Sequence, residues 1–113
     1  MPVVLDFVPA AETLRLLAMA QAAAVTIHLP TALRKYCSGA ADLSVSAPTV
    51  RAALEELHRD HPSLYRNICD ETGSVRRHLN VFVNSSHVRE RDGLDTALAA
   101  GDVVTILAAV SGG

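Results

Sequence analysis

The sequence predicts an α+β domain in which one main helix packs on one face of a mixed β-sheet. Segments in which apolar and polar residues alternate lie on both sides of one amphipathic helical segment. Half of the residues are hydrophobic but only 4% are aromatic, so the core is expected to consist of Val, Leu, Ile and Ala. At 113 residues, the chain has the usual length of one domain with one core.

The first two strands are expected to form a hairpin. Residues 25–29 alternate apolar with polar side chains and stop at Pro30, which is typical of a half-buried strand. Residues 43–47 alternate again, after a stretch at 31–42 that is expected to be a turn or loop. The short gap between the two strands favours antiparallel pairing.

The main helix is predicted to begin near Pro48 and to end at Pro62. Pro48 fits a first helical turn, where its missing N–H is not needed, and Thr49 is the alternative start as a side-chain cap. The predicted apolar stripe of this helix consists of Val50, Ala53, Leu54 and Leu57. Residues 63–78 are expected to contain a short helical turn, followed by a tight turn at residues 70–73.

Three further strands, one of them short, are expected after the helix. Residues 79–84 form the clearest one and turn back towards a short strand at 87–89, and residues 103–107 form the last strand. A short apolar piece at 94–100 lies between them. A hairpin, a crossover helix and a return to the sheet allow the first and last strands to lie side by side in parallel. This order of elements is that of the β-grasp, or ubiquitin-like, fold.

A series of short motifs runs through the last third of the chain. The motifs are Phe82-Val83-Asn84, Val88-Arg89, Gly93-Leu94, Thr96-Ala97, Gly101-Asp102, Val104-Thr105-Ile106-Leu107, Ala109-Val110 and Gly112-Gly113. In these motifs, residues 25–113 resemble the β-grasp sulfur carriers, the family that includes the molybdopterin synthase small subunit. The strongest similarity is to the carriers of thiocarboxylate-dependent cysteine synthesis. The family often has Pro where Ala108 stands, so the tail of this chain is expected to be less stiff.

The Gly112-Gly113 pair makes a thin arm that carries a carboxylate. The resemblance implies that an adenylating, E1-like enzyme activates the Gly113 carboxylate with ATP, and that sulfide or a persulfide displaces AMP to leave a thiocarboxylate. The sulfur then passes to an acceptor enzyme, such as a cysteine synthase or the molybdopterin synthase large subunit. The chain is therefore expected to be a carrier and not an enzyme, with no bound cofactor and with ATP used by its partner.

Alternation also predicts which face of the sheet is free. It assigns four aliphatic residues to the helix side, namely Val81, Val83, Val104 and Ile106. The residues predicted to bind partner proteins, on the open face and at the start of the tail, are Phe82, Thr105, Leu107, Ala109 and Val110. An outward Phe beside an outward Leu forms an apolar patch, and such patches usually bind partners. A register shifted by one residue would exchange the two faces.

Other chemistries find little support in the sequence. Cys37 and Cys69 are too few for a cluster and lack CxxC spacing, so they are expected to be free thiols of a cytoplasmic protein. His58 and His61 have no third ligand at a recognisable spacing, which argues against a metal site. A net charge of −2 without a basic patch argues against nucleic acid. Two other classes remain open: a protein modifier joined to lysines through Gly113, and a ubiquitin-like interaction domain whose Gly-Gly is incidental.

Residues 1–24 differ in composition from the rest of the chain. Ala, Leu and Met dominate residues 10–24, which favours either a helix outside the sheet or an over-long reading frame with Met19 as the true start. The expected organisation is an extension at 1–24, a β-grasp domain at 25–109 and a flexible tail at 110–113. The apolar run near residue 20 is too short to span a membrane and lacks a preceding positive charge, so no membrane contact is expected.

Overall fold

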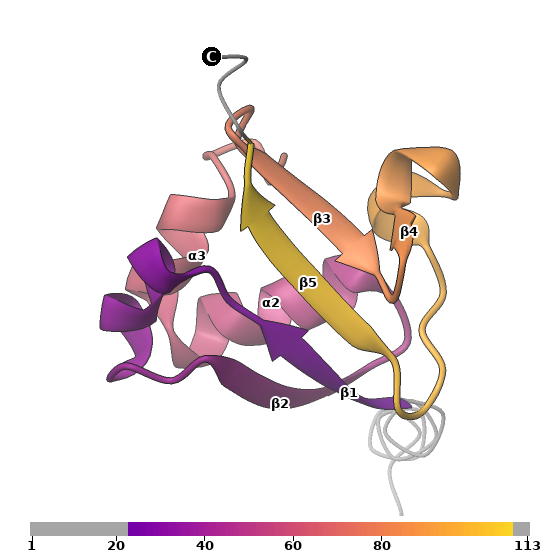
Figure 1. The fold of residues 1–113 in the computed structure, drawn as a ribbon, viewed down its shortest axis with the longest axis horizontal. Coiled ribbons are helices and arrows are strands. Elements are labelled where there is room, and N and C mark those ends of the chain that lie inside the picture. Colours follow the sequence, from indigo (N-terminus) through magenta and orange to yellow (C-terminus); the bar gives the residue numbers. More distant parts are fainter. Residues whose placement is uncertain (1–22, 110–113) are drawn as a thin grey trace, which may run out of the picture.

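The computed structural model describes residues 23–109, which form a five-stranded mixed sheet in the order β2-β1-β5-β3-β4 (Figure 1). β1 (Ala23–His28) and β2 (Asp42–Ala47) form an antiparallel hairpin. β5 (Val103–Ala108) lies parallel to β1 and antiparallel to β3 (Leu79–Val83), so it is central. β4 (Ser86–His87) adds a short edge beside β3. The predicted hairpin and the predicted parallel pairing of the first and last strands are both confirmed.

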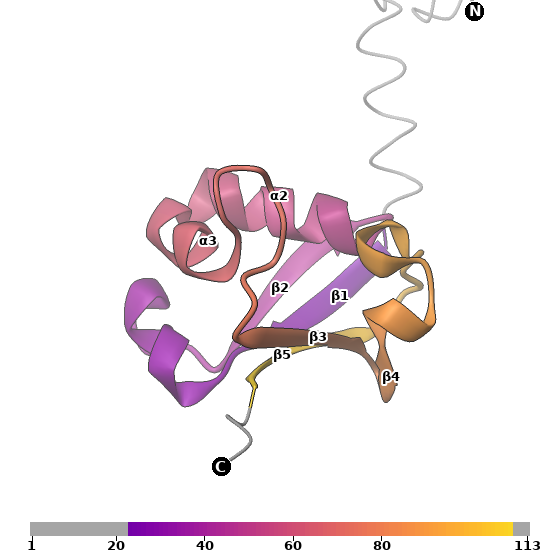
Figure 2. The ribbon, with the colours of Figure 1, turned by 90° about the horizontal axis from the view of Figure 1, so that it is seen from above.

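Two α-helices cover one face of this sheet (Figure 2). α2 (Val50–Asp60) begins at Thr49, whose side-chain oxygen accepts the backbone N–H of Ala52 at 3.1 Å. Thr49, and not Pro48, is therefore the N-cap. The predicted stripe is confirmed, since its four residues are all buried: Val50, Ala53, Leu54 and Leu57. α3 (Pro62–Ile68) follows directly and buries Leu64 and Ile68.

Three sequence-based boundaries were wrong. The predicted loop at 31–42 contains a 3-10 helix, η2 (Thr31–Cys37), which buries Leu33 and Cys37 on one side. The predicted short strand at 87–89 is observed as β4 at Ser86–His87, because the His87 side chain accepts the Arg89 N–H and the chain enters the 3-10 helix η3 (Val88–Glu90). Pro62 follows the end of α2, as predicted, and also occupies the first turn of α3, where no N–H is required. β1 begins at Ala23, two residues before the predicted start, because its pairing with β2 extends to Ala47.

The register of β3 and β5 places the predicted aliphatic residues towards the helices. Val81, Val83, Val104 and Ile106 are each at most 1% exposed. Between these pairs, Phe82 lies opposite Thr105, and both side chains are half-buried on the face of the sheet that the helices do not cover. The assignment of the two faces from alternation is confirmed.

A hydrogen-bond network at the start of β5 fixes this register. The Asn84 side chain accepts the Val103 N–H at 3.0 Å and donates to the Asp102 carboxylate at 3.1 Å. Asp102 also accepts the Ala99 N–H at 2.8 Å. The Ala99 N–H and then the Asn84 amide lower the pKa of Asp102 below its ordinary value, because they stabilise the charged form. Asp102 therefore supports the turn, and this support is lost as the pH falls through its lowered pKa.

Neighbouring residues on β5 provide a matched test of the two faces. Ile106→Ala should lower the free energy of unfolding by about 2–5 kcal/mol, because it leaves a cavity in the core. Leu107→Ala should change that free energy by only about 0.5 kcal/mol, because Leu107 is 44% exposed. Urea unfolding followed by circular dichroism measures both values. Equal destabilisation by the two variants would contradict the observed register.

Candidate functional site

The open face of the sheet brings together the residues predicted to bind partners. Thr105 lies opposite Phe82 on β3 and opposite His28 on β1. Leu107 lies opposite Asn80, diagonal to Phe82. At 44%, Leu107 is the one large hydrophobic side chain that is exposed within residues 23–109. The structure thus places Phe82, Thr105 and Leu107 on one surface beside the end of β5.

A polar cluster that the sequence did not predict borders this surface. The His87 ring meets the Phe82 ring edge-on, with the centroids 5.0 Å apart. His87 Nδ1 accepts the Arg89 backbone N–H at 3.0 Å, so its proton lies on Nε2 and is donated to Asn80 Oδ1, also at 3.0 Å. The Arg89 guanidinium donates to the same Asn80 oxygen at 3.3 Å. The Phe82 ring therefore has a polar rim of Asn80, His87 and Arg89.

The sequence contained one signal for this cluster. Asn84 and Ser85 form a tight turn, with Asn84 in the left-handed region at φ 54°, so that Phe82 and His87 face each other across the hairpin. The turn was predicted, but the register of the strand after it was not. His87 was consequently missed as a neighbour of Phe82.

The structure also fixes the point at which the chain leaves the sheet. Ala108 and Ala109 are exposed, and the Ala109 N–H donates to the His78 carbonyl at 2.6 Å. This hydrogen bond extends the β3–β5 ladder to the last described residue. The remaining predicted site residues lie outside the described range: Val110, Gly112 and Gly113.

Neither cysteine is placed to act as a nucleophile. Cys37 and Cys69 are both free and both buried. The Cys37 thiol points at the carbonyls of Arg34 and Ala40, at 3.5 and 3.4 Å. Burial, above other causes, raises the pKa of the Cys69 thiol, which disfavours the reactive thiolate. The described part of the chain therefore offers no exposed thiol on which to carry sulfur.

The histidines and helices give no other site. Within residues 23–109 no group of three or more His, Cys, Asp or Glu side chains is arranged to hold a metal ion. The His58 ring instead stacks on the Tyr65 ring, with the centroids 4.4 Å apart. Among the helices of the same range, none has the length and apolar character needed to cross a membrane.

Comparison with known proteins agrees with the fold and the motifs. The model of the ThiS family matches residues 27–113. The chain belongs to the ThiS family. This ThiS-family chain is 38% identical, over 91 residues, to the sulfur carrier protein CysO of Mycobacterium tuberculosis, and the match covers 79% of this chain and 98% of CysO. The resemblance to the β-grasp sulfur carriers that the sequence suggested is confirmed.

Solved structures and a modifier protein extend the similarity. The crystal structure of Mycobacterium tuberculosis CysO matches with a TM-score of 0.71 at 38% identity, covering 76% of this chain and 99% of that one. A chain in the BexX/CysO complex of Amycolatopsis orientalis matches with a TM-score of 0.71 at 32% identity, covering 79% and 99%. Small archaeal modifier protein 3 of Haloferax volcanii is 35% identical over 65 residues, covering 58% of this chain and 70% of the modifier.

Burial predicts how the two cysteines respond to a thiol reagent. In the folded protein at neutral pH, both thiols should react with Ellman's reagent far more slowly than a free cysteine, because both are buried and the raised pKa of Cys69 keeps its thiol protonated. In urea, both should react at once. Rapid reaction of either thiol in the folded protein would contradict the assignment of these residues to the core.

Proposed function

We propose that this ThiS-family chain carries sulfur as a thiocarboxylate on Gly113, as the substrate of an E1-like adenylating enzyme and without enzymatic activity of its own. The observation that carries the proposal is the similarity to a sulfur carrier protein over 98% of that protein's length. The geometry supports it, because the chain leaves the sheet from an exposed, hydrogen-bonded end of the central strand.

The proposed chemistry needs no nucleophilic side chain from the folded domain. The Gly113 carboxylate attacks the α-phosphorus of ATP, and pyrophosphate leaves. Sulfide then attacks the acyl carbon of the adenylate, the bond to the AMP oxygen breaks, and a thiocarboxylate remains. A persulfide in the place of sulfide first gives an acyl disulfide, and a thiol of the sulfur donor then cleaves its S–S bond, which releases the thiocarboxylate and leaves a disulfide on the donor. The activating enzyme supplies catalysis, and the carrier supplies position by holding the base of its tail in the sheet. ATP is thus used by the partner, and the carrier binds no cofactor.

The open face beside the tail is the proposed docking surface for the activating enzyme. It consists of Phe82, Thr105, Leu107 and Ala109, with Val110 as the next residue along the chain. Its apolar centre and polar rim match the usual anatomy of an interface hot spot, in which anchors are surrounded by groups that exclude water.

Two enzymes are candidates for the acceptor of the sulfur. We favour cysteine synthesis, on the motifs shared with that group of carriers, and keep the molybdopterin synthase large subunit as the alternative acceptor. Incubation of the loaded carrier with each candidate acceptor enzyme, followed by measurement of thiocarboxylate loss and product formation, separates the two routes. We place both routes, and the carrier, in the cytoplasm, where cysteines usually remain as free thiols.

Protein modification is a second candidate, favoured by the similarity to a small archaeal modifier protein. In that case the activated Gly113 would form an amide with a lysine of a target protein. An epitope-tagged carrier should then appear on a denaturing blot of cell extract as a ladder of larger species. A single band at the size of the free carrier would remove this candidate.

Gly113 should be essential for sulfur loading and unimportant for folding. Deletion of Gly113, or addition of one Ala after it, should leave the melting temperature unchanged because a terminal residue contributes little to stability. Either change should abolish thiocarboxylate formation with ATP, sulfide and the activating enzyme, as measured by intact mass. Normal loading of the extended protein, with no protease present to trim it, would refute the proposal.

The docking surface should tolerate loss of its apolar anchors without unfolding. Phe82→Ala and Leu107→Ala should each weaken binding to the activating enzyme by about 1–3 kcal/mol, as truncated interface anchors do. Ser46→Ala is the matched control, because Ser46 is exposed on the same face but on the far strand β2. Calorimetry measures the affinities. Unchanged binding in both variants would mean that the enzyme docks elsewhere.

A further inference from the structure

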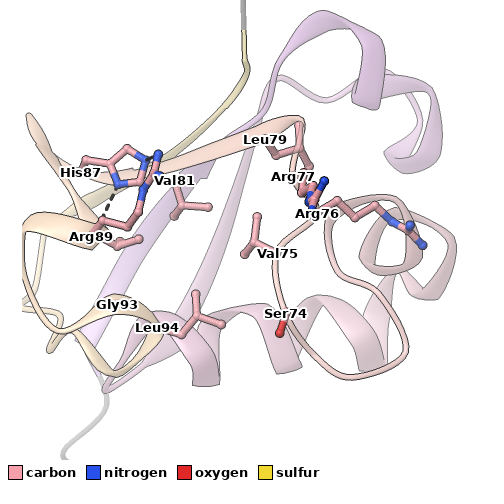
Figure 3. A pocket seen from close by; sticks show the side chains of 11 residues that line it. Ser74, Val75, Arg76, Arg77, Leu79, Val81, His87, Arg89, Gly93 and Leu94 are labelled. Carbon is pink, nitrogen blue, oxygen red and sulfur yellow. Dashed lines mark hydrogen bonds between the residues drawn. The ribbon is translucent and has the colours of Figure 1, made fainter.

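A groove of about 400 Å³ lies along β3 on the helix side of the sheet, and it shares only His87 and Arg89 with the polar rim of the open face (Figure 3). The loop before β3 forms one wall, and the 3-10 helices η3 (Val88–Glu90) and η4 (Gly93–Asp95) form the other. The apolar side chains that line it are Val75, Leu79, Val81, Val88 and Leu94. None of these residues belongs to the docking surface.

The two rims of the groove are positively charged. Arg77 lies at the loop wall and Arg89 at the opposite wall. Neither arginine has a carboxylate within ion-pairing distance in the part of the chain that the structure describes, where the ion pairs involve His28, Arg51 and Arg59. Arg76 points elsewhere and donates to the Arg66 carbonyl at 2.9 Å. In a chain of net charge −2, these rims are a local exception that is complementary to an acidic ligand.

The strand beside the groove has an outer edge that is open at Val81, while the Leu79 N–H donates to the Arg76 carbonyl at 3.0 Å. β4 pairs with β3 only at Phe82 and Val83, so Leu79–Val81 has no strand partner on its outer side within residues 23–109. The backbone groups of His78 and Asn84 hydrogen-bond towards β5. Backbone groups of successive residues in a strand point alternately to its two edges, so the N–H and C=O of Val81 point to the outer edge. An extended segment can pair with them there.

We propose that this groove binds an extended, acidic segment of a partner protein. The segment pairs as a strand with the backbone of Val81, places apolar side chains against Val75 and Leu94, and sets carboxylates against Arg77 and Arg89. Main-chain pairing supplies affinity, while the apolar floor and the two guanidinium groups supply specificity. Because the groove shares only His87 and Arg89 with the polar rim of the open face, a partner bound here leaves Phe82 and Leu107 uncovered.

A random peptide library displayed on phage tests this proposal with the full-length chain as bait. Selected peptides should alternate apolar residues with Asp or Glu. A selected peptide, once synthesised, should bind Arg77→Glu about tenfold or more weakly than the wild type, since charge-assisted hydrogen bonds become repulsions. Lys35→Glu makes the same change of charge at an exposed site on η2, outside the groove, and should bind normally. Arg77→Gln should lie between the two, and melting temperatures exclude unfolding.

Amide NMR shifts in the same titration locate the peptide. Shifts should centre on Val81 and Leu94. Shifts centred on Phe82 and Leu107, selection without acidic residues, or equal binding by Arg77→Glu and Lys35→Glu would each overturn the proposal. Protection of the Val81 amide from hydrogen exchange in the isolated chain would also overturn the proposal, if that protection disappeared on dilution or on deletion of residues 1–22. A second copy of the chain, or the chain's own segment, would then occupy the groove. Sulfur loading of Arg77→Glu is measured separately, so failure here is distinguishable from failure of the carrier proposal.

Discussion

The pairing of β5 between β1 and β3 is the constraint on which the rest of the structure depends. Five register pairs join β5 to β3, and three join it to β1. Val104 and Ile106 are fully buried beneath the helices, while Thr105 and Leu107 point to the other face. One strand thus fastens the core and presents the proposed docking surface. Its register must be unique, because a slip by one residue would bury Leu107 and expose Ile106.

The same pairing explains how the proposed carrier contributes to its reaction. The hydrogen bond from Ala109 to His78 holds the chain at the base of the tail, in the middle of the sheet rather than at an edge. The proposed reactive carboxylate then lies a few residues from a fixed point. An enzyme that binds the open face meets the tail at a defined position, which reduces the entropy lost on reaching the productive geometry.

Sequence patterns predicted those elements whose form follows from the spacing of apolar residues within one segment. Period-two alternation located the longer strands and assigned their faces, and helical spacing located α2. The 3-10 helix η2 was missed, because only Leu33 and Cys37 mark its fully buried side, and one such pair is too short a pattern to indicate a helix. The groove was beyond prediction, since Val75, Val81 and Leu94 come from three separate segments that only the folded chain brings together. The chemistry assigned to Gly113 came from the shared motifs and not from any spacing.

The location of sulfur on the loaded protein tests the central claim most directly. The full chain is incubated with ATP, sulfide and an E1-like activating enzyme, and the intact protein is then fragmented in the mass spectrometer. The account predicts that one oxygen is replaced by sulfur and that the mass change lies in fragments containing Gly113. Sulfur found on Cys37 or Cys69, or an unchanged mass with an enzyme that loads another member of the ThiS family, would contradict it.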